Sequence, residues 1–203
     1  PILRAGVPLH LTYGMTETAS QVATSARVID PEHVHVGHSL GKTQISVDQS
    51  GEIRVKGPTL ARMILDRGEW RDPRDAAGWF STGDLGELLP DGELRIIGRC
   101  DRMLISGGEN IHPETIETHL AAIPEVRRVA VVAVNDVEYG QRPVAFIDGP
   151  TAEGELRRHL ASRLERYFIP DHFFPWPEEV SASAVKIDYP ALTLCAQALL
   201  ERR

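Results

Sequence analysis

The chain has few cysteines, few aromatic residues and no long apolar run in its 203 residues. Its two cysteines, Cys100 and Cys195, are too few for a disulfide framework, and neither belongs to a Cys-x-x-Cys pair. The longest apolar run, Val129 to Val134, is far shorter than the ~20 residues that a membrane helix needs. These shortages argue against a disulfide-stapled secreted scaffold and against a membrane-spanning helix, and they favour a reducing compartment.

The sequence also lacks an excess of positive charge. Its formal net charge is -7 and its pI is near 5.6, so no global basic field would attract nucleic acid or acidic lipid. Hydrophobic residues make up 42% and charged residues 25%, which is typical of globular proteins and excludes a disordered tail, a collagen-like repeat or a coiled coil. At roughly 150 residues per domain, this length predicts one large domain or two small ones.

The first hundred residues show the pattern of short strands joined by glycine turns. Residues 44–48 and 52–56 alternate apolar and polar side chains around Ser50-Gly51, and residues 85–89 and 93–97 do so around Pro90-Asp91-Gly92. Alternation with a period of two around a turn signal indicates a β-hairpin. We therefore predict a small antiparallel β subdomain.

The pattern becomes mixed after Arg99. Helices are predicted from Pro113, on the spacing of Ile116, Leu120 and Ile123; across Leu156, Leu160 and Leu164, ending before Pro170; and from Pro190, on the spacing of Leu192, Ala196 and Leu199. Buried strands are predicted at 126–134 and, shorter, at 143–147. Helices covering strands in about 100 residues predict a compact α+β domain, with a junction near residues 99–102.

Residues 11–18, Leu-Thr-Tyr-Gly-Met-Thr-Glu-Thr, have the chemistry of a phosphate and metal site. Gly14 would let the backbone approach a ligand, the Thr16 hydroxyl could donate to an anionic oxygen, and Glu17 could hold a hard cation such as Mg²⁺. A plain glycine turn with capping threonines explains the same residues.

Three further polar segments contain candidate residues, and each has a plain structural interpretation. Asp84, in Ser81-Thr82-Gly83-Asp84 just before a predicted strand, could accept hydrogen bonds from a ribose diol or bond its own turn. The glycines that follow Gly98-Arg99-Cys100-Asp101-Arg102, in residues 106–111, permit close approach of an extended ligand or form a simple turn. Lys186, between Val185 and Ile187, is by itself an ordinary solvated charge.

A different kind of site is suggested by the pattern His-x-His-x-x-His at His33, His35 and His38. Zinc binds imidazole readily, but no cysteine follows and Glu32 is a weak fourth ligand. Histidines of a connecting loop are the favoured interpretation.

In this order and spacing, the segments resemble those of the acyl-adenylate-forming enzymes, which include acyl-CoA synthetases, luciferases and peptide-synthetase adenylation domains. The resemblance covers nearly the whole chain and rests on Tyr-Gly-Met-Thr-Glu at 13–17, Ser-Thr-Gly-Asp at 81–84, Gly-Arg with Asp101, residues 106–114 and the late Lys186. Residues 13–22, 106–113, 138–145 (EYGQRPVA), 175–179 and 185–187 are also similar to the branch that joins o-succinylbenzoate to CoA in menaquinone synthesis.

The resemblance implies two half-reactions at one site. A carboxylate attacks the α-phosphate of ATP, and the CoA thiol then displaces AMP from the acyl-adenylate. Thr16 would bond the α-phosphate, Glu17 would hold Mg²⁺, and Lys186 would neutralise charge during adenylation. The nucleoside contacts that the resemblance implies are Tyr13 and Gly14 at the adenine, and Asp84 and Arg99 at the ribose.

The resemblance also assigns residues to the later steps. Asp101 matches the hinge about which a small domain swings, and Gly107 and Gly108 match the turn that the pantetheine arm of CoA passes. The residues expected to face the acyl pocket are Thr18, Ser20 and Gln21.

The implied domains are residues 1–100, the closing β portion of a large AMP-binding domain, and residues 101–203, a small mobile lid. The co-substrates would be ATP, CoA and a small acid, with Mg²⁺, and with no nucleic acid or membrane span. Enzymes of this group act in the cytoplasm; the oligomeric state is not indicated. The family's phosphate loop ending in Pro-Lys is not in this sequence, so we expect a fragment that does not turn over ATP alone.

Three alternatives stay open. A fatty-acyl or other aromatic-acyl CoA ligase would share the mechanism. A non-catalytic adenylate-binding module is a second alternative. A carrier-dependent peptide-synthetase domain is disfavoured, because no carrier segment follows Lys186.

Overall fold

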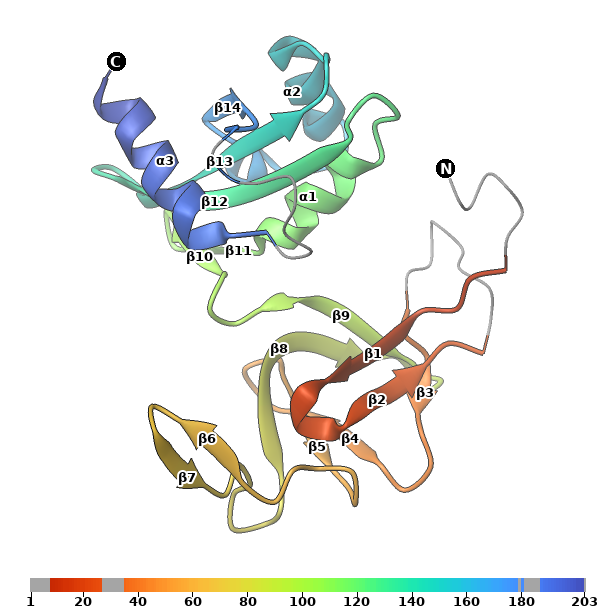
Figure 1. The fold of residues 1–203 in the computed structure, drawn as a ribbon. Helices are drawn as coiled ribbons and strands as arrows, with labels where there is room; N and C mark the ends of the chain where they lie inside the picture. The colour runs from red at the N-terminus through yellow and green to blue at the C-terminus, as the bar shows by residue number, and fades with distance from the viewer. Residues whose placement is uncertain (1–7, 27–34, 179, 181–186, 203) are drawn as a thin grey trace. The chain divides into compact units, whose positions relative to one another are not determined.

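The computed structural model describes residues 8–26, 35–178, 180 and 187–202. The chain divides into two compact units, Pro1–Cys100 (unit 1) and Asp101–Arg203 (unit 2). Antiparallel sheets fill the first unit and the α-helices lie in the second (Figure 1), so the predicted α+β class is confirmed. In the part of the chain that the structure describes, no helix is long and apolar enough to cross a membrane.

Unit 1 contains two main sheets and a separate hairpin. The first sheet has the order β1 (Thr12–Met15), β2 (Ser20–Thr24) and β3 (His38–Ser39), with a short 3-10 helix, η2 (Thr16–Thr18), between β1 and β2. The second has the order β4 (Gln44–Val47), β5 (Glu52–Lys56), β8 (Phe80–Leu88) and β9 (Leu94–Arg99). The hairpin consists of β6 (Ile64–Asp66) and β7 (Glu69–Arg71).

Both predicted hairpins of unit 1 are present. In β4–β5, Ile45 lies opposite Val55, and in β8–β9, Leu88 lies opposite Leu94. The prediction that residues 81–84 precede a strand is wrong, because β8 begins at Phe80 and contains them. Pairing with β5 on one side and β9 on the other keeps this polar stretch extended.

One hydrophobic cluster joins the two main sheets of unit 1. Buried side chains come from β2, from the residues just before β3 and from the second sheet: Val22, Ala23, Val36, Ile53, Val55 and Leu94. Tyr13 packs against this cluster from β1. The burial therefore holds β1 and its following turn against the strands that carry Asp84 and Arg99.

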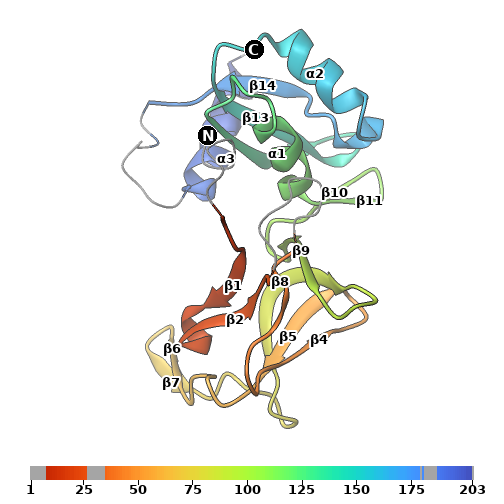
Figure 2. The same ribbon diagram turned by 90° about the vertical axis from the view of Figure 1, so that its right-hand side faces the viewer.

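Unit 2 has a five-stranded sheet with helices on both faces (Figures 1 and 2). Its strands are β10 (Leu104–Ser106), β11 (Glu109–Ile111), β12 (Arg128–Asp136), β13 (Gly140–Asp148) and β14 (His172–Pro175). Its helices are α1 (Pro113–Ala121), α2 (Glu153–Ala161), the short η3 (Arg166–Phe168) and α3 (Tyr189–Glu201). The order is β11-β10-β13-β12, and β14 pairs with β13 in parallel.

Burial on both faces explains the longest apolar run of the sequence. Val131 packs on one side with Ile116 and Leu120 of α1, and Val132 packs on the other with Leu192 of α3. A strand that is buried on both faces does not alternate apolar and polar residues, so its sequence is continuously hydrophobic.

The predicted elements of unit 2 exist, with corrected bounds. β12 begins two residues later than predicted, and β13 begins three residues earlier, at Gly140, because its first residues continue the pairing with β12. Ile123 lies outside α1, where the following Pro124 disfavours helix. Leu164 lies outside α2, although its amide still bonds the Leu160 carbonyl (2.8 Å).

Candidate functional site

Three residues predicted to contact a nucleoside meet at one point in unit 1. Asp84 and Arg99 lie directly opposite each other on β8 and β9, and the Arg99 guanidinium donates to Asp84 Oδ1 (3.0 Å). From β1, the Tyr13 hydroxyl donates to Asp84 Oδ2 (2.5 Å). The sequence placed these residues in separate motifs, and the packing of the two sheets brings them together.

Burial around this cluster differs from residue to residue. The Asp84 side chain is 15% exposed, whereas that of Arg99 is 45% exposed. Burial and the hydrogen bond to the negatively charged Asp84 raise the pKa of Tyr13 above its ordinary range, so the phenol stays a donor. A carboxylate offers about four acceptor positions, so Asp84 keeps capacity for hydroxyl donors beyond these two bonds.

Gly83 makes room for the Arg99 side chain. Its φ is +74°, and a Cβ at this position would lie 3.3 Å from the Arg99 Nη2 atom. The Gly83 amide donates to Glu52 Oε1 (2.9 Å), and the Thr82 hydroxyl donates to the Ile53 carbonyl (2.8 Å). These two bonds attach residues 82 and 83 of β8 to β5.

The turn between β1 and β2 carries the predicted phosphate and metal residues Thr16 and Glu17. A Cβ on Gly14 would lie 1.7 Å from the Ser20 carbonyl oxygen, so only glycine fits at this point of the β1–β2 pairing. Ala19 and Ser20 have positive φ values of 59° and 141°, which side chains rarely adopt. Such conformations persist where surrounding structure enforces them, often at binding sites.

An open depression of about 590 Å³ lies beside this turn. It is lined by Thr12, Gly14, Met15, Thr16, Ala19, Ser20 and Gln21. Four of these, Gly14, Thr16, Ser20 and Gln21, are predicted site residues. The depression could hold part of a ligand that also reaches the exposed Thr16 hydroxyl.

Thr18 has a different environment from its neighbours. It is 1% exposed, and its hydroxyl accepts from the Met15 amide (3.3 Å) and donates to the Met15 carbonyl (3.0 Å). Because these bonds close the turn, we assign Thr18 to the architecture of the turn, in place of the acyl pocket. Ser20 and Gln21 are exposed and line the depression.

Glu17 suits a Mg²⁺ ion that is held mainly by phosphates. The Glu17 backbone carbonyl accepts from the Ala61 amide (2.7 Å). The Glu17 residue is partly exposed on the turn. Among the described residues, no group of three His, Cys, Asp or Glu side chains could form a metal site. A single carboxylate together with substrate phosphates is a usual way of binding Mg²⁺.

The histidine pattern does not form a zinc site in the described residues. The His35 ring contacts Glu93 (3.0 Å), and the His38 ring contacts the Asp91 carbonyl (3.0 Å). His33 and Glu32 lie outside the described residues.

In unit 2, the predicted CoA residues form the turn between β10 and β11. Gly107 and Gly108 have φ values of +60° and +91°. A Cβ on Gly107 would lie 3.3 Å from the Tyr139 ring, whereas a Cβ on Gly108 would meet nothing within 4 Å. One side of the turn is therefore covered and the other is open.

The predicted hinge residue, Asp101, is the first residue of unit 2. Its role stays a prediction, as do those of Lys186, which lies outside the described residues, and of the other predicted site residues.

Sequence reasoning gave no role to Arg102, which pairs with Glu114 (2.8 Å) and Glu117 (2.6 Å) and lies 3.6 Å from the Tyr189 ring centre. Glu114 and Glu117, which lie one turn apart on α1, were the sequence feature that could have indicated this cluster.

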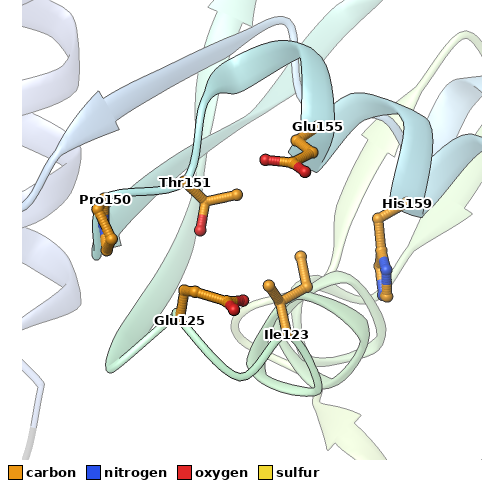
Figure 3. A pocket seen from close by; sticks show the side chains of 6 residues that line it. All are labelled: Ile123, Glu125, Pro150, Thr151, Glu155 and His159. Atoms are coloured by element: carbon orange, nitrogen blue, oxygen red, sulfur yellow. The ribbon is translucent and has the colours of Figure 1, made fainter.

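A second depression, of about 330 Å³, lies elsewhere in unit 2. It is lined by Ile123, Glu125, Pro150, Thr151, Glu155 and His159. Figure 3 shows Glu125 and Glu155 on opposite sides of it. It contains none of the predicted site residues.

Comparison with known proteins supports the class that the motifs implied. Residues 115–182 match the family described as the AMP-binding enzyme C-terminal domain. Residues 115–182, which lie in unit 2, therefore resemble the C-terminal domain of AMP-binding enzymes, the class that the motifs implied.

Within that class, the chain is similar to 2-succinylbenzoate–CoA ligases. It is 35% identical to that of Geobacillus kaustophilus, over 86% of this chain and 39% of the relative. The o-succinylbenzoate CoA synthetase (MenE) of Bacillus subtilis, solved with the acyl-adenylate intermediate OSB-AMP, has a TM-score of 0.79 and 32% identity, covering 94% of this chain and 42% of that chain.

A variant of E. coli MenE, solved with bound OSB-AMS, is also similar. Its TM-score is 0.83 and its identity 30%, covering 98% of this chain and 43% of that chain. The chain thus spans about two fifths of the length of the curated relatives that it matches.

Proposed function

We propose that the protein takes part in an AMP-forming acid–CoA ligation, with 2-succinylbenzoate as the acid. ATP and the acid would give 2-succinylbenzoyl-adenylate and pyrophosphate, and the CoA thiol would then displace AMP to give the thioester. Residues 1–100 would supply nucleotide contacts at the end of a large domain. Residues 101–203 would be the small lid, turning at Asp101. We place the protein in the cytoplasm.

The observation that carries this proposal is the meeting of Tyr13, Asp84 and Arg99 at one point. A mostly buried carboxylate held by a phenol and a guanidinium is fixed in orientation and still has acceptor capacity for a ribose diol. Thr16 and Glu17 follow the β1 strand of Tyr13 in the same hairpin, where they could contact the phosphates of a nucleotide whose ribose lies at Asp84.

The likeness to 2-succinylbenzoate–CoA ligases supports this substrate. Two exposed polar residues, Ser20 and Gln21, line the depression beside Thr16. An acid with a second carboxylate would find hydrogen-bond donors there, whereas a fatty-acyl chain would favour an apolar lining.

The test is a turnover assay of the protein as its gene encodes it. It is incubated with ATP, Mg²⁺ and CoA, together with 2-succinylbenzoate, benzoate or a series of fatty acids, and AMP and acyl-CoA are quantified by mass spectrometry. We expect kcat/KM to be highest for 2-succinylbenzoate. A preference for fatty acids would support the alternative ligase, and binding of AMP without any turnover would support a non-catalytic module.

A further inference from the structure

The segment 138–145, which marked a likeness but had no assigned role, packs against the β10–β11 turn. Gly140 on β13 lies opposite Ser106 on β10. Three hydrogen bonds connect the two segments: the Gly107 amide to the Tyr139 carbonyl (2.9 Å), the Ile105 amide to Gln141 Oε1 (3.0 Å) and Arg142 Nη1 to Ser106 Oγ (3.1 Å). Each of three successive residues before Gly108 is thus held by one residue of 139–142.

Arg142 is itself held in place. Its side chain is 12% exposed, and it donates to both carboxylate oxygens of Asp171 (2.9 and 2.7 Å). It also donates to the carbonyls of Tyr167 (3.2 Å) and Ile169 (3.3 Å). A guanidinium with this many partners has no freedom to follow a displaced turn, so it fixes the Ser106 hydroxyl relative to β13.

Residues 139–142 contact the turn on the side of Gly107, whereas the space beside Gly108 is open. The Tyr139 ring covers Gly107, and its neighbour Gly108 faces a region in which a Cβ would meet nothing. Both turn residues are glycines with positive φ, so neither contributes a side chain, and the turn depends on contacts from 139–142.

We propose that Gln141 and Arg142 are positioning residues for CoA. By bonding residues 105 and 106 from β13, they keep the backbone around Gly108 in the conformation that the extended pantetheine arm requires. Preorganisation of this kind lowers the ordering cost of binding. The inference rests on the proposed ligase function and deepens it, because it separates the CoA step from adenylation, in which CoA takes no part.

The variants are Arg142→Lys and Gln141→Ala, with Arg157→Lys as the matched control. Arg157 also bonds the segment 167–171 that holds Arg142, by donating to the carbonyls of Pro170 (2.9 Å) and Asp171 (2.6 Å). Among the described contacts, none connects Arg157 with residues 105–107. Lysine keeps the charge at each position and cannot make the branched set of bonds that arginine makes.

The readouts are the KM for CoA, the rate of ATP–pyrophosphate exchange and amide hydrogen exchange. We expect Arg142→Lys to raise the KM for CoA by about tenfold, since it loses hydrogen bonds of a charged group. Gln141→Ala should act more weakly in the same direction. Exchange of pyrophosphate should stay within about twofold, and Arg157→Lys should change neither value.

Equal loss of adenylation and thioester formation in Arg142→Lys, or an identical effect of Arg157→Lys, would overturn the proposal. An unaltered KM for CoA would do so as well. If the wild-type protein has no ligase activity, the proposed function fails, and the CoA role with it. Amide exchange then tests whether Arg142 stabilises the β10–β11 turn. Faster exchange at Gly107 in Arg142→Lys would support this stabilising role, and unchanged exchange would reject it.

Discussion

The Tyr13 hydroxyl donates a hydrogen bond of 2.5 Å to Asp84, although the two residues are 71 positions apart in the sequence. Arg99 reaches the other oxygen of the same carboxylate. The group that we expect to bind ribose is therefore oriented before any ligand arrives, and this preorganisation limits the ordering cost of nucleotide binding.

Removal of the Tyr13 hydroxyl should weaken unit 1. Tyr13→Phe keeps the ring in the core and deletes a bond to a charged acceptor, which is worth about 1.5–3 kcal/mol. We expect the free energy of unfolding, measured in urea, to fall by that amount. Tyr167→Phe is the control, because its hydroxyl lies in unit 2; an equal loss there would contradict the special role of Tyr13.

The hydroxyl of Thr18 and the side chain of Gln21 should have separable effects. Thr18→Val leaves the Met15 amide without its side-chain acceptor and should lower the free energy of unfolding by about 1–3 kcal/mol. Gln21→Ala should leave stability unchanged and raise the KM for the acid about three- to tenfold, through loss of one hydrogen bond. The reverse result would return Thr18 to the acyl pocket.

Alkaline pH should destabilise unit 2 through Tyr189. Burial, followed by the negative charge of Glu117, raises the pKa of Tyr189 from its ordinary value of 10.0 to about 12. The folded state therefore holds the phenol proton more tightly than the unfolded state. The resulting stability is fully present below pH about 10 and is lost as the pH rises through about 12.

Tyr189→Phe tests this dependence while keeping the ring beside Arg102. Urea unfolding at pH 8, 10 and 11 should show a smaller loss of stability with pH in the variant than in the wild type. The other tyrosines titrate in both proteins and cancel in the difference. Identical pH profiles would contradict the effect of Tyr189.

Lys186→Ala should separate the two half-reactions. Loss of a positive charge at the α-phosphate should slow adenylation by about 100-fold or more. Thioester formation from supplied acyl-adenylate and CoA should stay within a few-fold of the wild type. Lys42→Ala, at an exposed position in unit 1, is the charge-matched control. Equal loss of both steps in Lys186→Ala would contradict its assigned role.

Local pattern predicted the helices α1, α2 and α3 and the strands β4, β5, β8, β9, β12 and β13, and it failed where pairing partners decide. The β4–β5 and β8–β9 hairpins follow from alternation around glycine turns. The strand β14 (His172–Pro175) was not predicted, because it is short and ends in proline, and only its parallel pairing with β13 keeps it extended. The β6–β7 hairpin was also missed, since its central pair, Leu65 and Trp70, is exposed.

The candidate site was visible in the sequence as separate motifs. Their spacing indicated the chemistry of Thr16, Glu17 and Asp84, but it could not show that Tyr13 bonds Asp84, because that contact depends on how two sheets pack. The burial of Thr18 and the support of Gly107 by Tyr139 were hidden for the same reason. Long-range contacts of this kind leave no periodic signal.

The central claim is that Asp84 accepts the ribose hydroxyls of an adenylate. Its most direct test is calorimetric binding of AMP, 2′-deoxy-AMP and 3′-deoxy-AMP to the wild-type protein and to Asp84→Asn, with Asp91→Asn as the control. We expect loss of a hydroxyl to weaken binding about tenfold in the wild type and in the control, and to have little effect in Asp84→Asn. An equal penalty for the missing hydroxyls in Asp84→Asn would contradict the claim.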